Sequence, residues 1–158
     1  IQLAMAAELA KLPDDAAVLL VRLFEKLNLS LNKQRETITL VSEIARRDGI
    51  SIRQVLTHAT FRRIAGDDEL DRVRKTRQIR DFLRQWRYPR IVAAENQYHR
   101  NVKKLKFGQH LKLIPPKDFE GSSYALVLNF DSIAQLKLLH DKIDQILQHP
   151  SLLEIIDS

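Results

Sequence analysis

Apolar residues recur every three to four positions along the first two thirds of the chain, which is the period of amphipathic helices. The first such segment covers residues 2–12 and ends at Pro13, because proline has no backbone N–H to donate. The second begins at Asp14 or Asp15, either of which can cap it, and continues to about Asn28. The pattern thus predicts two short helices at the start.

Four further helices are predicted before residue 107. Ser30 or Asn32 opens a helix that Gly49 ends, and Ser51 caps the next. A Gly-Asp-Asp turn at residue 66 and Pro89 separate the later ones. The predicted ranges are 30–49, 51–61, 69–87 and 91–105, and the inward face of the helix at 69–87 is formed by Ile79, Phe82, Leu83 and Trp86.

Beyond Gly108 apolar residues alternate with others, which is the period of strands. Two short strands are predicted at 111–114 and 124–130, followed by a terminal helix that Asp131 caps. Pro150 ends this helix, and a short helical tail follows. We therefore predict a mainly α fold, with a helical bundle over residues 1–107 and a small α+β unit with two short strands and a terminal helix over residues 108–158.

The composition agrees with a packed, helix-rich protein. Hydrophobic residues make up 44% of the chain and charged residues 29%, with only 4 Gly and 5 Pro. The lack of cysteine excludes disulfides and a thiol nucleophile, and no apolar stretch is long enough to cross a membrane. We expect a cytoplasmic protein. Because the chain begins with Ile1 in the middle of a helical pattern, we interpret it as a piece of a longer protein.

The positive charge is concentrated in one region. The net charge is +6, yet residues 72–106 hold 12 Lys and Arg against only Asp81 and Glu95, so this segment carries +10 and the remainder −4. Within it, four arginines at spacings i, i+3, i+7 and i+10 share one strip of the predicted helix, beside the apolar strip. They are Arg77, Arg80, Arg84 and Arg87, and Arg74 and Lys75 precede them.

Such a strip fits a phosphate backbone, because the guanidinium fork binds phosphate oxygens in pairs and displaces condensed counterions. The prediction is contact with nucleic acid, DNA above all. One alternative is a solvated face whose arginines pair with acidic residues elsewhere in the chain. Another is contact with an acidic protein or a membrane surface.

Residues 43–55 partly fit a helix-turn-helix. Ala45, Gly49, Ile50 and Val55 have the spacing that lets two helices cross closely. The second helix would carry Arg53, Gln54, Thr57 and His58, and Arg46, Arg47 and Arg53 would contact phosphates. The alternative is an ordinary helical corner, because Asp48 and His58 occupy positions that are usually apolar in the motif.

Nothing in the sequence indicates catalysis. The five histidines include no pair at i, i+4, and no glycine-rich phosphate loop or nucleophile motif is present. We predict a non-catalytic chain with no metal, no cofactor and no small-molecule substrate.

The stretch from Leu12-Pro13 to Leu29-Ser30, continuing through Lys33-Gln34 to Arg35, resembles the helical central domain of ParB-type partition proteins. That family has a Leu-Pro helix start, a Leu-Ser turn and an arginine five positions after the serine, as Ser30 and Arg35 are here. Lys33 and Gln34 stand where the family has His-Ala. The resemblance covers about residues 10–60, and the remainder looks like the C-terminal part of bacterial proteins that begin with a ParB-like domain.

The resemblance implies DNA association and self-association. The ParB-like N-terminal domain and its arginine-rich box are not in these residues, so no activity housed there is carried over. The alternative function is a protein-interaction or dimerisation module that regulates such a domain, with the strand at 124–130 or the terminal helix pairing with a second copy.

Overall fold

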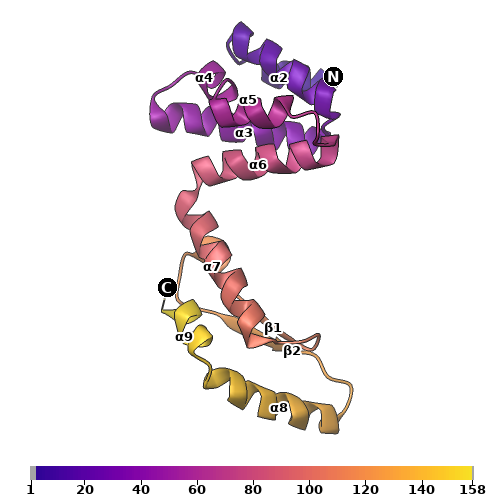
Figure 1. Cartoon of the computed structure of the whole chain (residues 1–158), viewed down its shortest axis with the longest axis vertical. Coiled ribbons are helices and arrows are strands. Elements are labelled where there is room, and N and C mark those ends of the chain that lie inside the picture. The colour runs from indigo at the N-terminus through magenta and orange to yellow at the C-terminus, as the bar shows by residue number, and fades with distance from the viewer. Residues whose placement is uncertain (1–2, 158) are drawn as a thin grey trace. The chain divides into compact units, whose positions relative to one another are not determined.

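The computed structural model describes residues 3–157, so Gln2, where the first helix was expected to begin, lies outside the described residues. Nine α-helices and one two-stranded sheet are found within this range (Figure 1). The chain divides into two compact units, Ile1–Pro89 and Arg90–Ser158. The predicted mainly α fold, with a small sheet followed by a helix, is confirmed.

The first unit is entirely helical within the described residues. Its helices are α1 (Leu3–Leu9), α2 (Asp14–Leu27), α3 (Leu31–Asp48), α4 (Ile52–Leu56), α5 (Ala59–Gly66) and α6 (Arg72–Arg87).

Helix α3 has the bounds that its flanking residues predict. Ser30 precedes it in an extended conformation, and Gly49 follows it with φ of 67°. The left-handed turn at Gly49 directs the N–H of Ile50 to the carbonyl of Ala45 at 3.0 Å, which closes the helix end. Glycine suits this position because it has no Cβ to strain.

The helix predicted at 51–61 is wrong as a single element, because the chain forms α4 and α5 instead. Ser51 caps α4 as predicted, in a reciprocal capping box with Gln54. His58 then leaves the helical conformation, and its Nδ1 accepts a hydrogen bond from the N–H of Thr60 at 3.2 Å. This imidazole cap starts α5, and apolar periodicity does not reveal it.

Helix α6 begins at Arg72, three residues later than predicted. The Asp71 carboxylate accepts a hydrogen bond from the N–H of Arg74 at 2.8 Å and so caps the helix. Ile79 and Leu83 are buried, and Phe82 and Trp86 pack half-buried against the core, which confirms the predicted inward face. The residues of this core that are fully inaccessible are Met5, Leu20, Val41, Ile44, Val55 and Leu83.

The second unit combines a small sheet with helices. Strand β1 (Leu111–Ile114) pairs antiparallel with β2 (Ala125–Leu128), and Leu111 lies opposite Leu128. Both strands form where they were predicted, although β2 is shorter than the predicted 124–130. Burial alternates along β1 but not along β2. The helices are α7 (Pro89–Leu105), the 3-10 helix η1 (Lys117–Phe119), α8 (Ile133–Leu147) and α9 (Pro150–Ile156).

The boundary between the units differs from the predicted one at residue 107. Tyr98 and Leu105 of α7 are buried in a core shared with Leu111, Leu139 and Ile155, so α7 belongs to the second unit. The predicted cap of α8 is also wrong. Ser132, not Asp131, caps it, and its Oγ accepts the N–H of Gln135 at 3.1 Å.

Candidate nucleic-acid interface

The arginines of α6 lie in two rows, an inner row (Arg80 and Arg87) paired with α3 and an outer row (Arg74 and Arg77). Both nitrogens of the Arg80 fork reach Glu36: Nε and Nη2 each donate to a different carboxylate oxygen at 2.9 Å. This is the two-pronged geometry that makes arginine–carboxylate pairs strong. Arg80 is therefore already engaged with an anion within the chain.

The second inner contact lies two helical turns further along. The Nε of Arg87 donates to Glu43 at 2.7 Å, and the Tyr88 hydroxyl donates to the same oxygen at 3.0 Å. The Arg87 guanidinium also lies 4.4 Å from the centre of the Tyr88 ring. Burial raises the pKa of Glu43, but these hydrogen bonds and the charges of Arg87 and Arg46 outweigh it, so the pKa lies below its ordinary value.

Arg47 completes the connection between the two helices. Its Nη1 donates to the carbonyls of Trp86 and Arg87, both at 2.9 Å, and so satisfies groups that the end of α6 leaves unpaired. Asp48 accepts bonds from Arg47 and from the Trp86 indole, the latter at 2.8 Å. The hydrogen bond from Arg47 is the main cause of the lowered pKa of Asp48. Arg47 thus has a structural role that fixes the C-terminus of α6.

The outer row faces solvent. The side chains of Arg74 and Arg77 are 72% and 83% exposed, and each has one long ion pair on its own helix turn, to Asp71 at 3.6 Å and to Asp81 at 3.8 Å. Exposed pairs of this kind contribute about 0–1 kcal/mol. Arg46 on α3 is likewise exposed. Arg74 and Arg77 can exchange these carboxylates for an external anion at little cost.

Two other predicted contacts are placed differently. The Lys75 side chain is only 8% exposed, and its Nζ lies 4.0 Å from Asp68, so it is poorly placed to reach a phosphate. Arg53 is exposed, with an ion pair to Asp15 at 3.6 Å. Arg84 is half-buried.

The corner between α3 and α4 differs from a DNA-binding helix-turn-helix in its second helix. The expected recognition helix is the five-residue α4, and the His58 ring packs against Phe82 and Trp86, with centroids 5.3 and 4.9 Å away. His58 is exposed, but its ring contacts these two aromatic side chains of α6. These placements favour the ordinary helical corner.

The sequence prediction of one continuous strip missed the carboxylates that pair with its inner row. Glu36 and Glu43 lie 44 residues before their partners, outside the segment in which acids are scarce. A signal was present, however, because the two glutamates share the seven-residue interval of Arg80 and Arg87. The inner row is thus paired with acidic residues elsewhere in the chain, as the alternative predicted. The exposed outer row remains accessible to a partner.

Within residues 3–157 no helix is long and apolar enough to cross a membrane, and no group of three His, Cys, Asp or Glu side chains is arranged to hold a metal ion. Comparisons with protein-family models, curated proteins and solved structures give no match.

Proposed function

We propose that the unit Ile1–Pro89 binds DNA through its phosphates, as a non-catalytic part of a ParB-like bacterial protein that acts in the cytoplasm. The contacts are the outer row of α6, Arg74 and Arg77, together with Arg46 of α3. Arg80, Arg87 and Arg47 hold α6 in place beneath that row.

The exposure of Arg74 and Arg77 carries the proposal. Both guanidinium groups extend from one side of a helix whose other contacts fix it to α3. The first unit has 17 Lys and Arg against 12 Asp and Glu, so its net charge of +5 favours a polyanion. A rigid helix with exposed arginines can follow a phosphate backbone without reordering the protein.

Binding through phosphates does not require a recognition helix that contacts base edges. Phosphates fix the position of a protein on the duplex, whereas base edges supply the sequence preference. The short α4, followed by His58 whose ring contacts Phe82 and Trp86, gives this unit few groups for base edges. We therefore expect binding with little sequence preference.

The test is fluorescence anisotropy of the chain with two unrelated duplexes over a salt series. We expect affinity to fall steeply as salt rises, and Arg74→Gln with Arg77→Gln to lower the slope of log affinity against log salt by about 1 for each lost contact. The matched control is Lys11→Gln with Arg22→Gln, which removes the same charge from exposed positions elsewhere. Absence of binding at low salt, or equal loss in the control, overturns the proposal.

The alternative is a dimerisation module, and a specific feature of the second unit favours it. On β1 one carbonyl is engaged by a helix, because the Tyr98 hydroxyl of α7 donates to the carbonyl of Leu113. Strand β2 pairs with no strand other than β1 among the described residues, and Leu126 and Val127 of β2 and the nearby Phe130 are exposed. An apolar edge strand is a template for pairing with another strand.

Sedimentation equilibrium tests this alternative. A dimer that Val127→Lys converts to monomer, while Leu138→Lys on the exposed side of α8 does not, would place the contact at the strand. A mass near 18.3 kDa at every concentration excludes self-association of this chain.

A further inference from the structure

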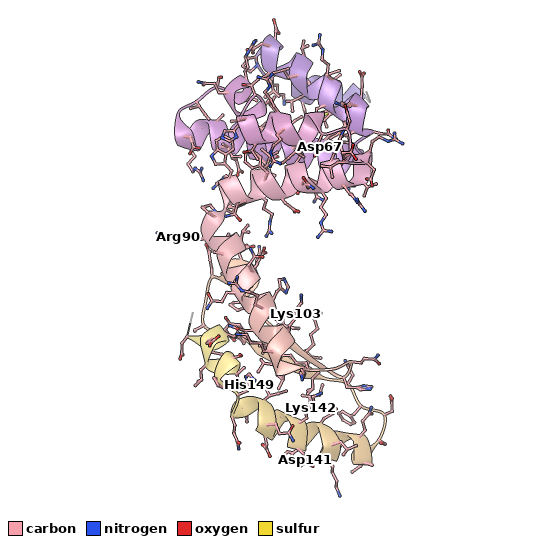
Figure 2. The ribbon with its side chains drawn as sticks, in the orientation of Figure 1. Asp67, Arg90, Lys103, Asp141, Lys142 and His149 are labelled. Atoms are coloured by element: carbon pink, nitrogen blue, oxygen red, sulfur yellow. The ribbon has the colours of Figure 1, made fainter. Side chains whose placement is uncertain are left out.

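The second unit contains a cavity of about 400 Å³ in which lysines from separate parts of the chain converge. Lys104 lies in the last turn of α7, Lys106 directly follows that helix, and Lys142 comes from α8. Figure 2 shows Lys142 on the side of α8 that faces the end of α7, with Asp141 on the other side. We call this group, with Gln145 and His149, the lysine pocket.

Lys142 is the least solvated of these cations. It is half-buried, and its Nζ lies so close to Gly108 that a Cβ placed there would be 3.3 Å away. Among the residues that the structure describes, no carboxylate lies within 4.0 Å of Lys142 or of Lys106, and no hydrogen bond engages either ammonium. A partly desolvated ammonium without an acceptor is unfavourable, so an anion at this position gains a preformed partner.

The backbone fixes the position of Lys106. Its φ of 49° is left-handed, which is uncommon for a residue with a long side chain. Buried Phe107 follows, and Gly108 is also left-handed with φ of 75°. This turn reverses the chain between α7 and β1 and sets Lys106 at the cavity beside Lys142.

The remaining lining groups supply neutral donors. The Nδ1 of His149 accepts the N–H of Ser151 at 3.1 Å, which leaves Nε2 as the nitrogen that carries the proton in the neutral ring. Gln145 adds an amide. One of the lining lysines already has a carboxylate partner, because a Glu154 oxygen is 3.8 Å from Lys104 in an exposed pair. Lys104 also donates to Asn101 at 3.1 Å.

We propose that the lysine pocket binds a phosphate group, with Lys106 and Lys142 as the principal contacts. The chemistry is common to a free phosphate compound, such as a nucleotide, and to the backbone of a nucleic acid. The pocket belongs to the second unit and the arginines of α6 belong to the first, so the proposal does not depend on DNA binding by the first unit.

The experiment is a titration of the isotope-labelled full chain with inorganic pyrophosphate, followed by amide chemical shifts. We expect saturable shifts at Lys106, Gly108 and Gln145, and about a tenfold weaker affinity in Lys142→Gln, since one hydrogen bond between charged groups is lost. Lys106→Asn should weaken it similarly, because asparagine accepts the left-handed conformation. The control is Lys137→Gln, which removes an exposed charge from the same helix.

A second titration with a short duplex separates the two sources. Pocket shifts with pyrophosphate identify a free phosphate ligand, whereas pocket shifts with the duplex alone identify a nucleic-acid backbone. Absence of pocket shifts with both, or equal weakening by Lys137→Gln and Lys142→Gln, overturns the proposal. Shifts in α6 and at the pocket are separate signals, so failure of one proposal is distinguishable from failure of the other.

Discussion

The carboxylate of Glu36 and the guanidinium of Arg80 are joined by two hydrogen bonds of 2.9 Å, although the two residues are 44 positions apart. Glu43 and Arg87 repeat this relationship seven residues further along both helices. Since the residue numbers increase along both helices from the first pair to the second, α3 and α6 run in the same direction. The most basic helix, α6, is thus attached to the rest of its unit through acidic residues of α3, which lies about 40 residues earlier in the sequence.

The Glu36–Arg80 pair should contribute measurably to stability. A double-mutant cycle with Glu36→Ala and Arg80→Ala, followed by urea unfolding, should give a coupling energy of about 1 kcal/mol, at the upper end for partly exposed pairs. The same cycle on Asp71 and Arg74, which are 61% and 72% exposed, should give a value near zero. Equal coupling in the two cycles would mean that the two-pronged geometry adds nothing.

Acid should weaken the first unit partly through Glu43. Its pKa in the folded protein is below the ordinary value of 4.5, so the stabilisation is present above that value and is lost as the pH falls through the lowered pKa. We expect the free energy of unfolding to decline between about pH 5 and pH 3, and Glu43→Gln to make that decline shallower. Urea unfolding at each pH measures it.

The control for this prediction is Glu25→Gln on the exposed side of α2, where no ion pair to a described residue is formed. It should leave the pH dependence of unfolding unchanged. A Glu43→Gln curve parallel to that of the parent chain would show that the contacts of Glu43 do not favour its ionised form.

Helix bounds were largely predictable because they depend on local chemistry. Gly49 ends α3 through a backbone conformation that glycine adopts freely, and the alternation around β2 placed both strands. The break at His58 was not predictable, because a helix cap formed by an imidazole has no effect on apolar periodicity. Local rules therefore identify elements well and miss side chains that cap in unusual ways.

The candidate site was predictable only in part, for a different reason. The spacing of the arginines showed that they share a side of one helix, but their partners depend on which helix packs beside it. The lysine pocket is a stronger example, since Lys106 and Lys142 meet only after the chain has passed through both strands. Contacts between distant segments require the fold itself.

Leu83 should be among the most sensitive positions of the first unit. It is fully buried, so Leu83→Ala should destabilise the unit by about 2–5 kcal/mol through lost burial and a cavity. Val73→Ala on the same helix removes a side chain that is 78% exposed and should change the stability by less than about 0.5 kcal/mol. Thermal or urea unfolding compares them, and similar effects would contradict the buried position of Leu83.

Removal of the Tyr98 hydroxyl should destabilise the second unit. That hydroxyl donates to the carbonyl of Leu113 at 2.5 Å, and Tyr98→Phe would leave this buried acceptor without its partner, at a cost of about 1–3 kcal/mol. Burial, together with the charge of Tyr124, raises the pKa of Tyr98. Unfolding of the variant measured by near-ultraviolet circular dichroism tests the contact, and unchanged stability would refute it.

The spacing of the arginines on α6 leaves its alignment with α3 ambiguous for ion pairing alone. Arg77 and Arg84 have the same seven-residue interval as Arg80 and Arg87, so a slide of one turn with a partial rotation would offer Glu36 and Glu43 an equivalent pair. Such one-turn steps are known modes of helix movement. The Trp86 bond to Asp48, the Arg47 bonds to the helix end and burial of Leu83 each accept only one alignment. The contacts that α6 makes through its indole, its terminal carbonyls and Leu83 thus select the register that its arginines alone would leave degenerate.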